Sequence, residues 1–315
     1  MIKLNQNSEE AEQHFLLVKH LIQGRAKNIL SRGINKKKKR VTLNNNLKNY
    51  LNSLLDDNQL KTLITAKPED LEAIILSIRQ TNPDFFSPKS NSNFVLRNIF
   101  IKSCYENEEF SNLEFIKRIN IDTCPYCNRQ YIYYLSNENK IKPQIDHFYP
   151  KSIYPILGIS FYNLIPSCQT CNGFGAKEEK DPTIFGLINP YLLKNDSFSF
   201  TYKIRTVNFI NSLFDKASIE VKLKNQLPGH LNVFKLDKLY EQHSDHVIEL
   251  ILKSKIEYSE EYRNYLKSYR DKGLRFNDSE IDRMILGNYS QESDIHKRPL
   301  AKLYQDIGRE LGLIK

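Results

Sequence analysis

Apolar residues recur at helical spacing along the first third of the chain. The repeat covers residues 15–29 and again 47–55, and steps of three and four residues are typical of an amphipathic helix. A Pro-Glu-Asp start at 68–70 leads into a third repeat of the same kind. The Ser- and Pro-containing stretch at 87–92 predicts a boundary, after which one more helix is expected over 93–119.

The middle of the chain changes to the spacing of strands. Aromatic and β-branched residues at 130–135 and a second short stretch at 141–146 flank a polar turn, which predicts a β-hairpin. Residues 197–205 alternate between apolar and polar side chains and are expected to add a strand to the same sheet. From residue 208 onward the helical repeat returns, and Pro299 marks the start of a last helix.

These patterns predict an α+β fold, mainly helical, with a small central module. The three predicted regions are a helical N-terminal region with a basic segment (1–95), the central module (96–207) and a helical C-terminal region (208–315). The composition is that of a folded chain, since 40% of the 315 residues are hydrophobic and 26% are charged. There is no apolar run of roughly 18 residues, as a membrane span requires, and no signal-like N-terminus, so we expect a cytoplasmic protein without a membrane partner.

The excess of positive charge is concentrated near the N-terminus. The net charge is +9, and residues 1–50 hold eleven basic against three acidic side chains. Five of these cations are adjacent: Lys36, Lys37, Lys38, Lys39 and Arg40. Because adjacent cations repel one another, we expect an exposed loop or a helix extension here. Two interpretations are open, an arm that contacts nucleic acid and a solvated surface run.

Four of the five cysteines fall into two identical spacings. The pairs are Cys124 with Cys127 and Cys168 with Cys171, each separated by two residues. Two thiolates at this spacing can grip one ion from a tight turn, so the paired motif predicts a tetrahedral zinc site. Two unrelated buried pairs and a redox pair are the weaker alternatives. The fifth, Cys104, is expected to be a small buried residue on a helix face.

An Asp-His pair lies between the two cysteine motifs. Asp146 and His147 end the second predicted strand, Asn163 follows within the next segment, and Asn172 comes directly after the last cysteine. Adjacent residues of a strand point to opposite faces, so the pair can share a site only where the chain kinks. Pro150 gives the strand a reason to end nearby.

The order of these residues resembles that of the HNH endonucleases, the His-Asn-His or ββα-metal family. The resemblance covers about residues 121–180 and implies a zinc-braced, treble-clef-like module in the centre of the chain. It implies that His147 is the general base, that Asp146 and Asn172 hold a catalytic Mg²⁺ or Mn²⁺, and that Asn163 orients the loop around the base. The third motif position is Asn172 rather than histidine, which suits a hard, oxygen-ligated cation. The four cysteines would hold the structural Zn²⁺.

The chemistry also follows from the residue types themselves. Hydrolysis of a phosphodiester needs a water nucleophile, charge neutralisation at the phosphoryl oxygens and help for the leaving oxygen, which a histidine and one divalent cation can supply. Lys151 and Lys177 are candidate phosphate contacts, with a plain surface role as the alternative. The tyrosines at 126, 131, 133 and 134 either fill the space beside the zinc or stack on bases.

The sequences of residues 146–152 and 163–168 are similar to those of HNH nucleases of bacterial anti-phage defence systems. One such nuclease is the HNH partner of the Septu type, which acts together with an ATPase. The resemblance implies nucleic acid, expected to be DNA, as the substrate and an ATPase as a partner protein. Two other classes stay open: a zinc-containing module that binds nucleic acid without cutting it, and a protein-interaction subunit. The Asp146-His147 pair favours the enzyme, because a pure binder has no need for it.

Overall fold

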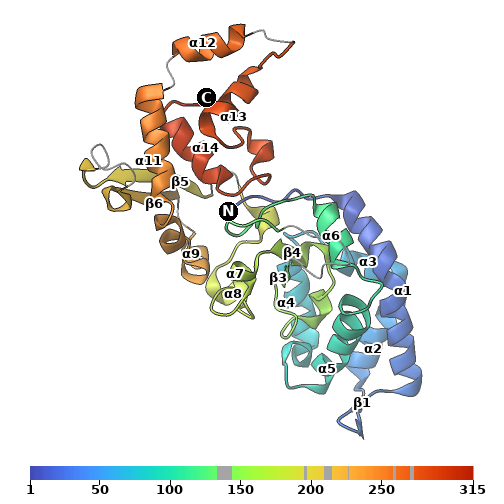
Figure 1. The fold of residues 1–315 in the computed structure, drawn as a ribbon. Helices are drawn as coiled ribbons and strands as arrows, with labels where there is room; N and C mark the ends of the chain where they lie inside the picture. Colours follow the sequence, from blue (N-terminus) through green and yellow to red (C-terminus); the bar gives the residue numbers. More distant parts are fainter. Residues whose placement is uncertain are drawn as a thin grey trace.

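The computed structural model describes residues 1–132, 144–194, 197–208, 215–225, 227–257, 260–269 and 273–314. Within these ranges the fold is mainly helical α+β, with three separate two-stranded antiparallel sheets (Figure 1). No helix in this part of the chain combines the length and the apolar character needed to cross a membrane.

The N-terminal region consists of packed helices, as predicted. The long helix α1 (Ser8–Arg32) begins at the cap Asn7 and buries the predicted repeat from Phe15 to Ile29. It ends at Gly33, whose φ of 73° lies in the left-handed region that glycine favours. Three shorter helices follow: α2 (Asn45–Ser53), α3 (Asp57–Ile64) and α4 (Leu71–Thr81). Helix α3 was not predicted, because eight residues are too few to show a clear repeat.

The five adjacent cations form a hairpin rather than a loop or a helix extension. Strands β1 (Asn35–Lys36) and β2 (Lys39–Arg40) pair across a two-residue turn. Lys37 and Lys38 have φ values of 47° and 67°, the positive values that a tight type I′ turn requires at both central positions. The predicted exposure is confirmed for the tip of this hairpin.

The single helix expected over 93–119 is two helical segments. Helix α5 (Asn91–Arg97) continues as a π-helix (Asn98–Tyr105), and α6 (Asn112–Ile119) begins again after a turn. The Ser111 side chain accepts a hydrogen bond from the Glu114 backbone at 3.3 Å, so a new N-cap competes with continuation of the first helix. Short 3₁₀ helices lie at Pro83–Phe86, Pro155–Leu157, Phe161–Asn163 and Pro190–Leu192.

The strand that carries Asp146 and His147 pairs with a later segment. Strand β3 (Gln144–His147) is antiparallel to β4 (Leu164–Ser167), with Asp146 opposite Ile165. The expected hairpin partner, 130–135, pairs through its first residues with 122–124 instead. Residues 133–143, with most of the predicted hairpin, lie outside the described residues.

Helix α7 (Gln169–Asn172) follows β4 directly. Its limits are set locally, since Cys168 is the N-cap and the backbone N–H of Gly173 closes the helix on Gln169 O. The central order is therefore strand, strand, short helix. Helix α8 (Pro182–Phe185) completes this part of the chain.

The C-terminal part contains a strand that we did not predict. Strand β5 (Ser199–Ile204) is confirmed, but it pairs with β6 (Ile219–Asn225) in a sheet of its own and not with β3. The period-two pattern of β6, Ile-Glu-Val-Lys-Leu-Lys, was a readable strand signal inside the region expected to be helical. The helices are α9 (Pro228–Phe234), α10 (Leu236–Glu241), α11 (Ser244–Leu252, continued by a π turn at Lys253–Glu257), α12 (Glu260–Ser268), α13 (Asp278–Leu286) and α14 (Ala301–Glu310).

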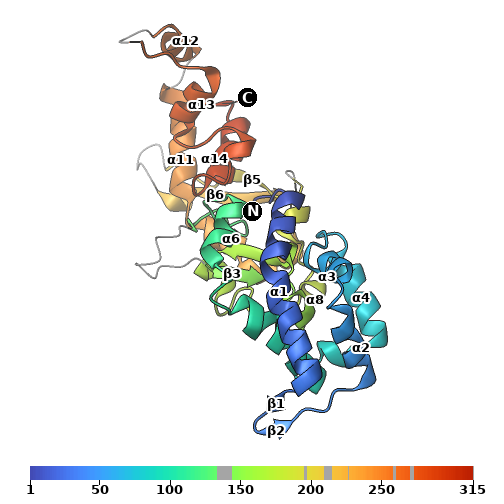
Figure 2. The same ribbon diagram turned by 90° about the vertical axis from the view of Figure 1, so that its right-hand side faces the viewer.

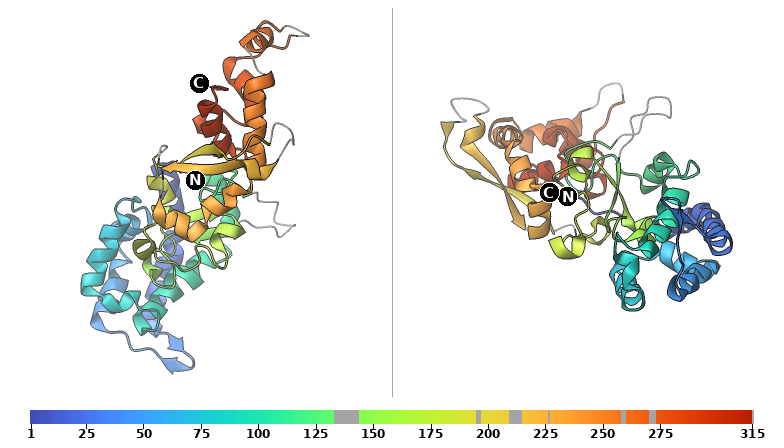
Figure 3. Two further views of the ribbon diagram at one scale, coloured as in Figure 1. Left: turned by 90° about the vertical axis from the view of Figure 1, so that its left-hand side faces the viewer. Right: turned by 90° about the horizontal axis from the view of Figure 1, so that it is seen from below.

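The regions share one apolar core that crosses both predicted boundaries. Asn93, for example, donates from Nδ2 to Phe85 O at 2.8 Å and to Ser152 O at 3.1 Å. Helices α11, α13 and α14 lie on one side of the β5–β6 sheet, and the N-terminal helices lie on its other side (Figures 2 and 3). The division at residues 95 and 207 stays a prediction.

Two buried histidines in this core predict a loss of stability in mild acid. Burial lowers the pKa of His14 to about 4 and that of His230 to about 3, and the His230 Nε2 accepts a hydrogen bond from the Ile188 N–H at 2.8 Å. Below pH 6.5 the unfolded chain binds protons that the folded chain does not, so stability falls as the pH falls, by up to about 1.4 kcal/mol per pH unit for each histidine.

Urea unfolding at pH 7, 6 and 5 measures this slope, above the range in which most carboxylates titrate. His14→Gln should make the slope shallower by one proton. A stability that stays level between pH 6.5 and 5 would contradict the assignment of both histidines as neutral.

Candidate functional site

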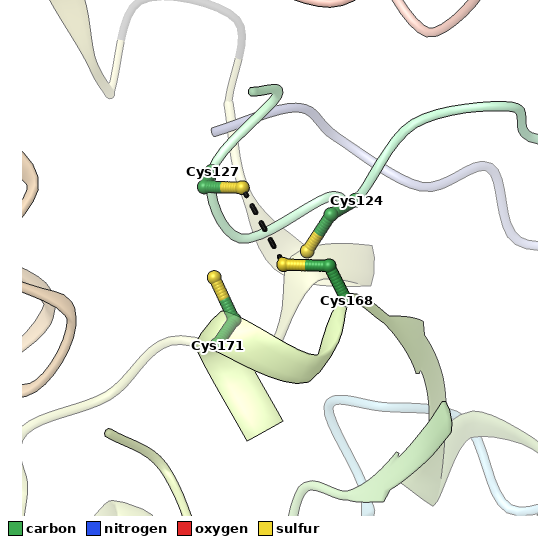
Figure 4. Close-up of side chains that lie close together, drawn as sticks. All are labelled: Cys124, Cys127, Cys168 and Cys171. Atoms are coloured by element: carbon green, nitrogen blue, oxygen red, sulfur yellow. Dashed lines mark hydrogen bonds between the residues drawn. The ribbon is translucent and has the colours of Figure 1, made fainter. Parts of the chain in front are cut away.

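The four paired cysteines come together in one buried cluster. Their sulfur atoms all lie within 4.8 Å of one another, although the two pairs are about forty residues apart in sequence. Cys124 and Cys127 come from the turn before 130, whereas Cys168 and Cys171 come from the N-terminal cap and the body of α7. Figure 4 shows the four side chains pointing toward a common centre. The spacing argument therefore predicted this cluster correctly.

The geometry fits a tetrahedral ion. The Cys127 and Cys168 sulfurs are 3.8 Å apart, which matches the edge of about 3.8 Å that four Zn–S bonds of about 2.3 Å would give. All five cysteines are free thiols, so no disulfide competes for the sulfurs. Burial raises the pKa of Cys124 well above its usual value, and a cation at the centre is what would allow several thiolates to coexist there.

The first cysteine turn is bound tightly to the rest of the chain. Asn128, fully buried and with a φ of 49°, donates from Nδ2 to Ile295 O at 3.1 Å and accepts at Oδ1 from the Lys302 N–H at 3.0 Å. Thr123 Oγ1 donates to His296 O at 2.9 Å. The cluster is thus linked directly to the segment that leads into α14, some 170 residues away in sequence.

Asp146 lies inside the protein with two polar partners. Its side chain is 2% exposed, Tyr126 donates its hydroxyl to Oδ2 at 2.6 Å, and Lys177 Nζ stands 4.0 Å from Oδ1. Burial raises the pKa of Asp146, while Lys177 and the tyrosine hydroxyl act in the opposite direction. The carboxylate is therefore held in a fixed orientation beside the cysteine cluster.

His147 has a different set of partners. Its Nε2 lies 2.9 Å from Gly158 O, and its ring meets the Tyr105 ring edge-on at 4.5 Å. Since a carbonyl oxygen only accepts, Nε2 must carry the proton, and the neutral ring keeps its lone pair on Nδ1. Burial lowers the pKa of His147 to about 3, so the imidazole is neutral at physiological pH.

No kink separates the two residues, because β3 keeps a regular register through His147. Their side chains accordingly contact different groups, as alternation along a strand requires. The turn comes afterwards, where Tyr154 N and Ile153 N both donate to Pro150 O. Whether the pair acts on one substrate stays a prediction.

Asn163 fastens the loop that follows His147. Its Oδ1 accepts from the Tyr149 N–H at 2.7 Å, and its Nδ2 donates to Tyr149 O at 3.2 Å and Leu157 O at 2.9 Å. The side chain is fully buried, so these bonds have no competition from water. A role in orienting the loop around His147 is compatible with this geometry.

Replacing Asn163 by alanine should lower the free energy of unfolding by about 2–4 kcal/mol, because it leaves buried backbone groups of the loop unpaired. Asn189→Ala is a matched control, since Asn189 is also buried and bonds to Tyr162 O and the Tyr191 N–H. Thermal unfolding should report a similar loss for both variants. Only Asn163→Ala is expected to disorder the loop and so change the NMR signals of His147. A change in the His147 signals that is equal in both variants would contradict the loop role.

Asn172 lies on the face of β3 that carries Asp146. It donates from Nδ2 to Gln144 Oε1 at 2.9 Å, and residues two apart on a strand share a face. The amide oxygen Oδ1 is thereby turned away from Gln144. Among the described His, Cys, Asp and Glu residues, the cysteine cluster is the only group of three or more that could hold a metal ion. A second ion held by Asp146 and Asn172 stays a prediction.

The residues predicted to contact phosphate differ in their surroundings and burial. Lys151 lies beside His147, with Nζ 4.9 Å from the Tyr105 ring centroid and 3.9 Å from Glu106. Lys177 is fully buried and donates to Lys180 O at 2.9 Å, so a phosphate could reach it only if neighbouring residues moved. The β1–β2 hairpin lies at the far end of α1, away from β3 and α7 (Figure 1).

Sequence reasoning missed Tyr105 and Gly158, and it named Tyr126 without its bond to Asp146. Tyr126 holds Asp146, Tyr105 packs on His147, and Gly158 accepts from His147. A Cβ at Gly158 would lie 2.1 Å from Ile101 Cδ1 of the π-helix, so a larger residue there would force this buried side chain to move. Of the predicted tyrosine group, Tyr126 is buried and Tyr131 is 39% exposed, while residues 133 and 134 are outside the described part.

A cavity of about 530 Å³ lies apart from this site. It is bordered by the N-terminal residues, the end of α6 and the segment before α14, and includes Lys3, Arg118 and Lys194. Neither Asp146 nor His147 lines it. The residues expected to carry the chemistry therefore lie outside this cavity.

Comparison with known proteins gives one partial similarity. A segment of 106 residues, 33% of this chain, is 33% identical to Septu protein PtuB of Bacillus thuringiensis. The match spans 37% of that protein, so it covers well under half of either chain. No family model and no solved structure matches the chain. The similarity points to a Septu-related protein, and the HNH assignment stays a prediction.

Proposed function

We propose that the chain is a metal-dependent endonuclease of the HNH type that hydrolyses phosphodiester bonds of nucleic acid. DNA is the expected substrate. The observation that carries this proposal is the order β3, Asn163, β4, α7 around the cysteine cluster. Asp146 and His147 end the first of these strands, Asn163 fastens the following loop, and Asn172 ends the helix. This order of elements is the one that a ββα-metal module would have.

His147 is the proton acceptor in this proposal. With Nε2 donating to Gly158 O, the Nδ1 lone pair is available to a water molecule. The low pKa of the buried ring makes it a weak base in the free protein, but a phosphodiester bound nearby would bring negative charge and raise that pKa toward neutrality. Lys151 on the same side can contact a phosphate oxygen.

Asp146 and Asn172 would hold a Mg²⁺ or Mn²⁺ ion. Their donors are a carboxylate and an amide oxygen, the hard oxygen ligands that these ions prefer, and both lie on one face of β3. The bound ion would neutralise phosphoryl charge and assist the leaving oxygen. Tyr126 and Lys177 orient the carboxylate, and the zinc cluster, with a closed shell, braces the module without taking part in hydrolysis.

The similarity to a Septu protein supports a role in bacterial anti-phage defence. We extend this to an ATPase partner protein and to a cytoplasmic location, both of which the sequence resemblance implies. Contact with nucleic acid through the β1–β2 hairpin belongs to the same proposal, because Lys37, Lys38 and Lys39 stand exposed at its tip.

Circular substrates test the proposal, because they have no ends for an exonuclease to attack. The zinc-loaded chain is incubated with circular single-stranded DNA, relaxed circular duplex DNA and a circular RNA, each with Mg²⁺ or Mn²⁺. We expect linear products from a DNA circle. Binding without cutting, in the presence and absence of an ATPase encoded beside the gene, would favour the alternative of a zinc-containing binding subunit, which the deep burial of Asp146 also suits.

A further inference from the structure

Three cationic side chains converge on one aromatic ring in the C-terminal part. The guanidinium carbons of Arg283 and Arg298 lie 4.1 and 5.8 Å from the centroid of the Tyr289 ring, and Lys297 Nζ lies 5.6 Å from it. Arg283 and Lys297 are exposed, while Tyr289 and Arg298 are half-buried. We call these four residues the Tyr289 patch.

The charges of this patch are only partly neutralised within the chain. Lys297 pairs with Asp294 at 2.9 Å. Arg298 donates to Gly287 O at 3.0 Å, and neither arginine has a carboxylate within 4.0 Å among the residues that the structure describes. Clustered like charges repel, so an anionic partner would stabilise this arrangement.

The patch is also held in a fixed position relative to the cysteine cluster. Lys297 and Arg298 lie in the short segment between His296, whose carbonyl accepts from Thr123, and Leu300, whose N–H donates to Asn128 O. The backbone of Tyr289 is fixed in turn, because Gln305 of α14 donates to its carbonyl at 3.0 Å. The cysteine turn thus anchors the 296–300 segment directly, whereas Tyr289 is held through α14.

We propose that the Tyr289 patch binds the phosphate backbone of the nucleic acid, next to the zinc-braced module. Guanidinium groups pair with phosphate oxygens through two parallel hydrogen bonds, and the Tyr289 ring holds the Arg283 guanidinium in place. The inference rests on the proposed function in taking nucleic acid as the substrate, and it adds a contact surface that the resemblance does not cover.

The position of the patch implies a path for the nucleic acid across the protein. Helix α13, which carries Arg283, and the β1–β2 hairpin lie on opposite sides of the β3–β4 strands in both views (Figures 1 and 2). Nucleic acid held at the patch and at the hairpin would therefore pass the region of Asp146 and His147. An acidic protein surface is the competing partner for the same cations.

The test compares salt-dependent binding by the full zinc-loaded chain and two triple variants. The patch variant carries Arg283→Gln, Lys297→Gln and Arg298→Gln. The control carries Lys67→Gln, Lys89→Gln and Lys235→Gln, three exposed lysines elsewhere. Fluorescence anisotropy without Mg²⁺ or Mn²⁺ follows binding to a 24-base-pair duplex, the matching single-stranded DNA and the matching RNA over a salt series.

We expect the patch variant to reduce the slope of log K against log salt by about 2–3, since each lost phosphate contact contributes about 0.9. Its affinity should fall at least about tenfold at physiological salt, while the control stays within about twofold of the parent. Arg283→Gln alone, at an exposed position of α13, should lose about one contact and guards against a folding defect of the triple variant.

Equal slopes for the patch and control variants would overturn the patch, as would a parent chain that binds none of the three probes at low salt. Patch-dependent binding without cleavage, both with Mg²⁺ alone and with Mg²⁺ and an ATPase encoded beside the gene, would leave the patch standing and overturn the endonuclease. If the chain cleaves and the patch variant keeps the parent slope of log K against log salt, the endonuclease stands and the patch is overturned.

Discussion

Replacing His147 by alanine should slow phosphodiester cleavage by roughly 10²–10⁴-fold, the contribution typical of a positioned general base. The variant removes the Nδ1 lone pair that the hydrogen bond from Nε2 to Gly158 O leaves available. It keeps Asp146, Asn172 and all four cysteines, so zinc content should stay at one ion per chain. Single-turnover cleavage at saturating protein measures the chemical step without the contribution of binding.

His14→Ala is the matched control for this variant. His14 is a buried histidine whose Nε2 bonds to Ile159 O at 2.8 Å, the carbonyl next to the one that His147 uses. Both alanine variants should lose stability, but His14→Ala should cleave at the parent rate under conditions where it is folded. Cleavage by His147→Ala at the parent rate would remove the base from this account, as would an equal loss in both variants.

Replacing Cys168 by serine should abolish zinc binding and unfold the central module. The Cys168 sulfur is 3.8 Å from that of Cys127, and the residue is also the N-cap of α7. Structural zinc contributes about 10–16 kcal/mol in small zinc-binding peptides, which matches or exceeds the total stability of a typical domain. Zinc content by elemental analysis should fall from one ion per chain to near zero, with loss of the cooperative thermal transition.

Cys104→Ser provides the control, because Cys104 is equally buried but stands outside the cluster. Burial raises the pKa of its thiol to about 12, which suits an inert packing residue. This variant should keep one zinc ion per chain. A full zinc content in Cys168→Ser, or its loss in Cys104→Ser, would contradict the assignment of the four ligands.

The sequence was most informative where the signal is local. The cysteine spacing predicted the cluster because two ligands from one tight turn must be near each other in sequence. The α1 and α4 repeats were equally clear, since one face of a long helix must be buried. The two-residue turn at Lys37 and Lys38 was missed because lysine is unusual at positive φ, where Asn and Gly are the expected residues.

Contacts between distant segments left no comparable signal. Nothing near Asn128 indicates that its side chain reaches residues 295 and 302, and nothing near Lys177 indicates that it is buried against Asp146. The role of Tyr126 as a hydrogen-bond donor to Asp146 depends on the fold of the cysteine turn. Strand β6 is a different case. Its alternation of apolar and polar residues predicts a strand, but the region was expected to be helical because of the helical repeats around it.

The central claim is that this chain cuts nucleic acid with a divalent cation held near Asp146. The most direct measurement is nicking of a supercoiled plasmid by the purified, zinc-loaded chain as Mg²⁺ is withheld, added and withheld again, with zinc content followed throughout. We expect nicked and linear plasmid with Mg²⁺ alone, while zinc stays at one ion per chain. A folded, zinc-loaded protein that binds the plasmid and leaves it supercoiled with Mg²⁺ or Mn²⁺, with and without an ATPase encoded beside the gene, would contradict the claim.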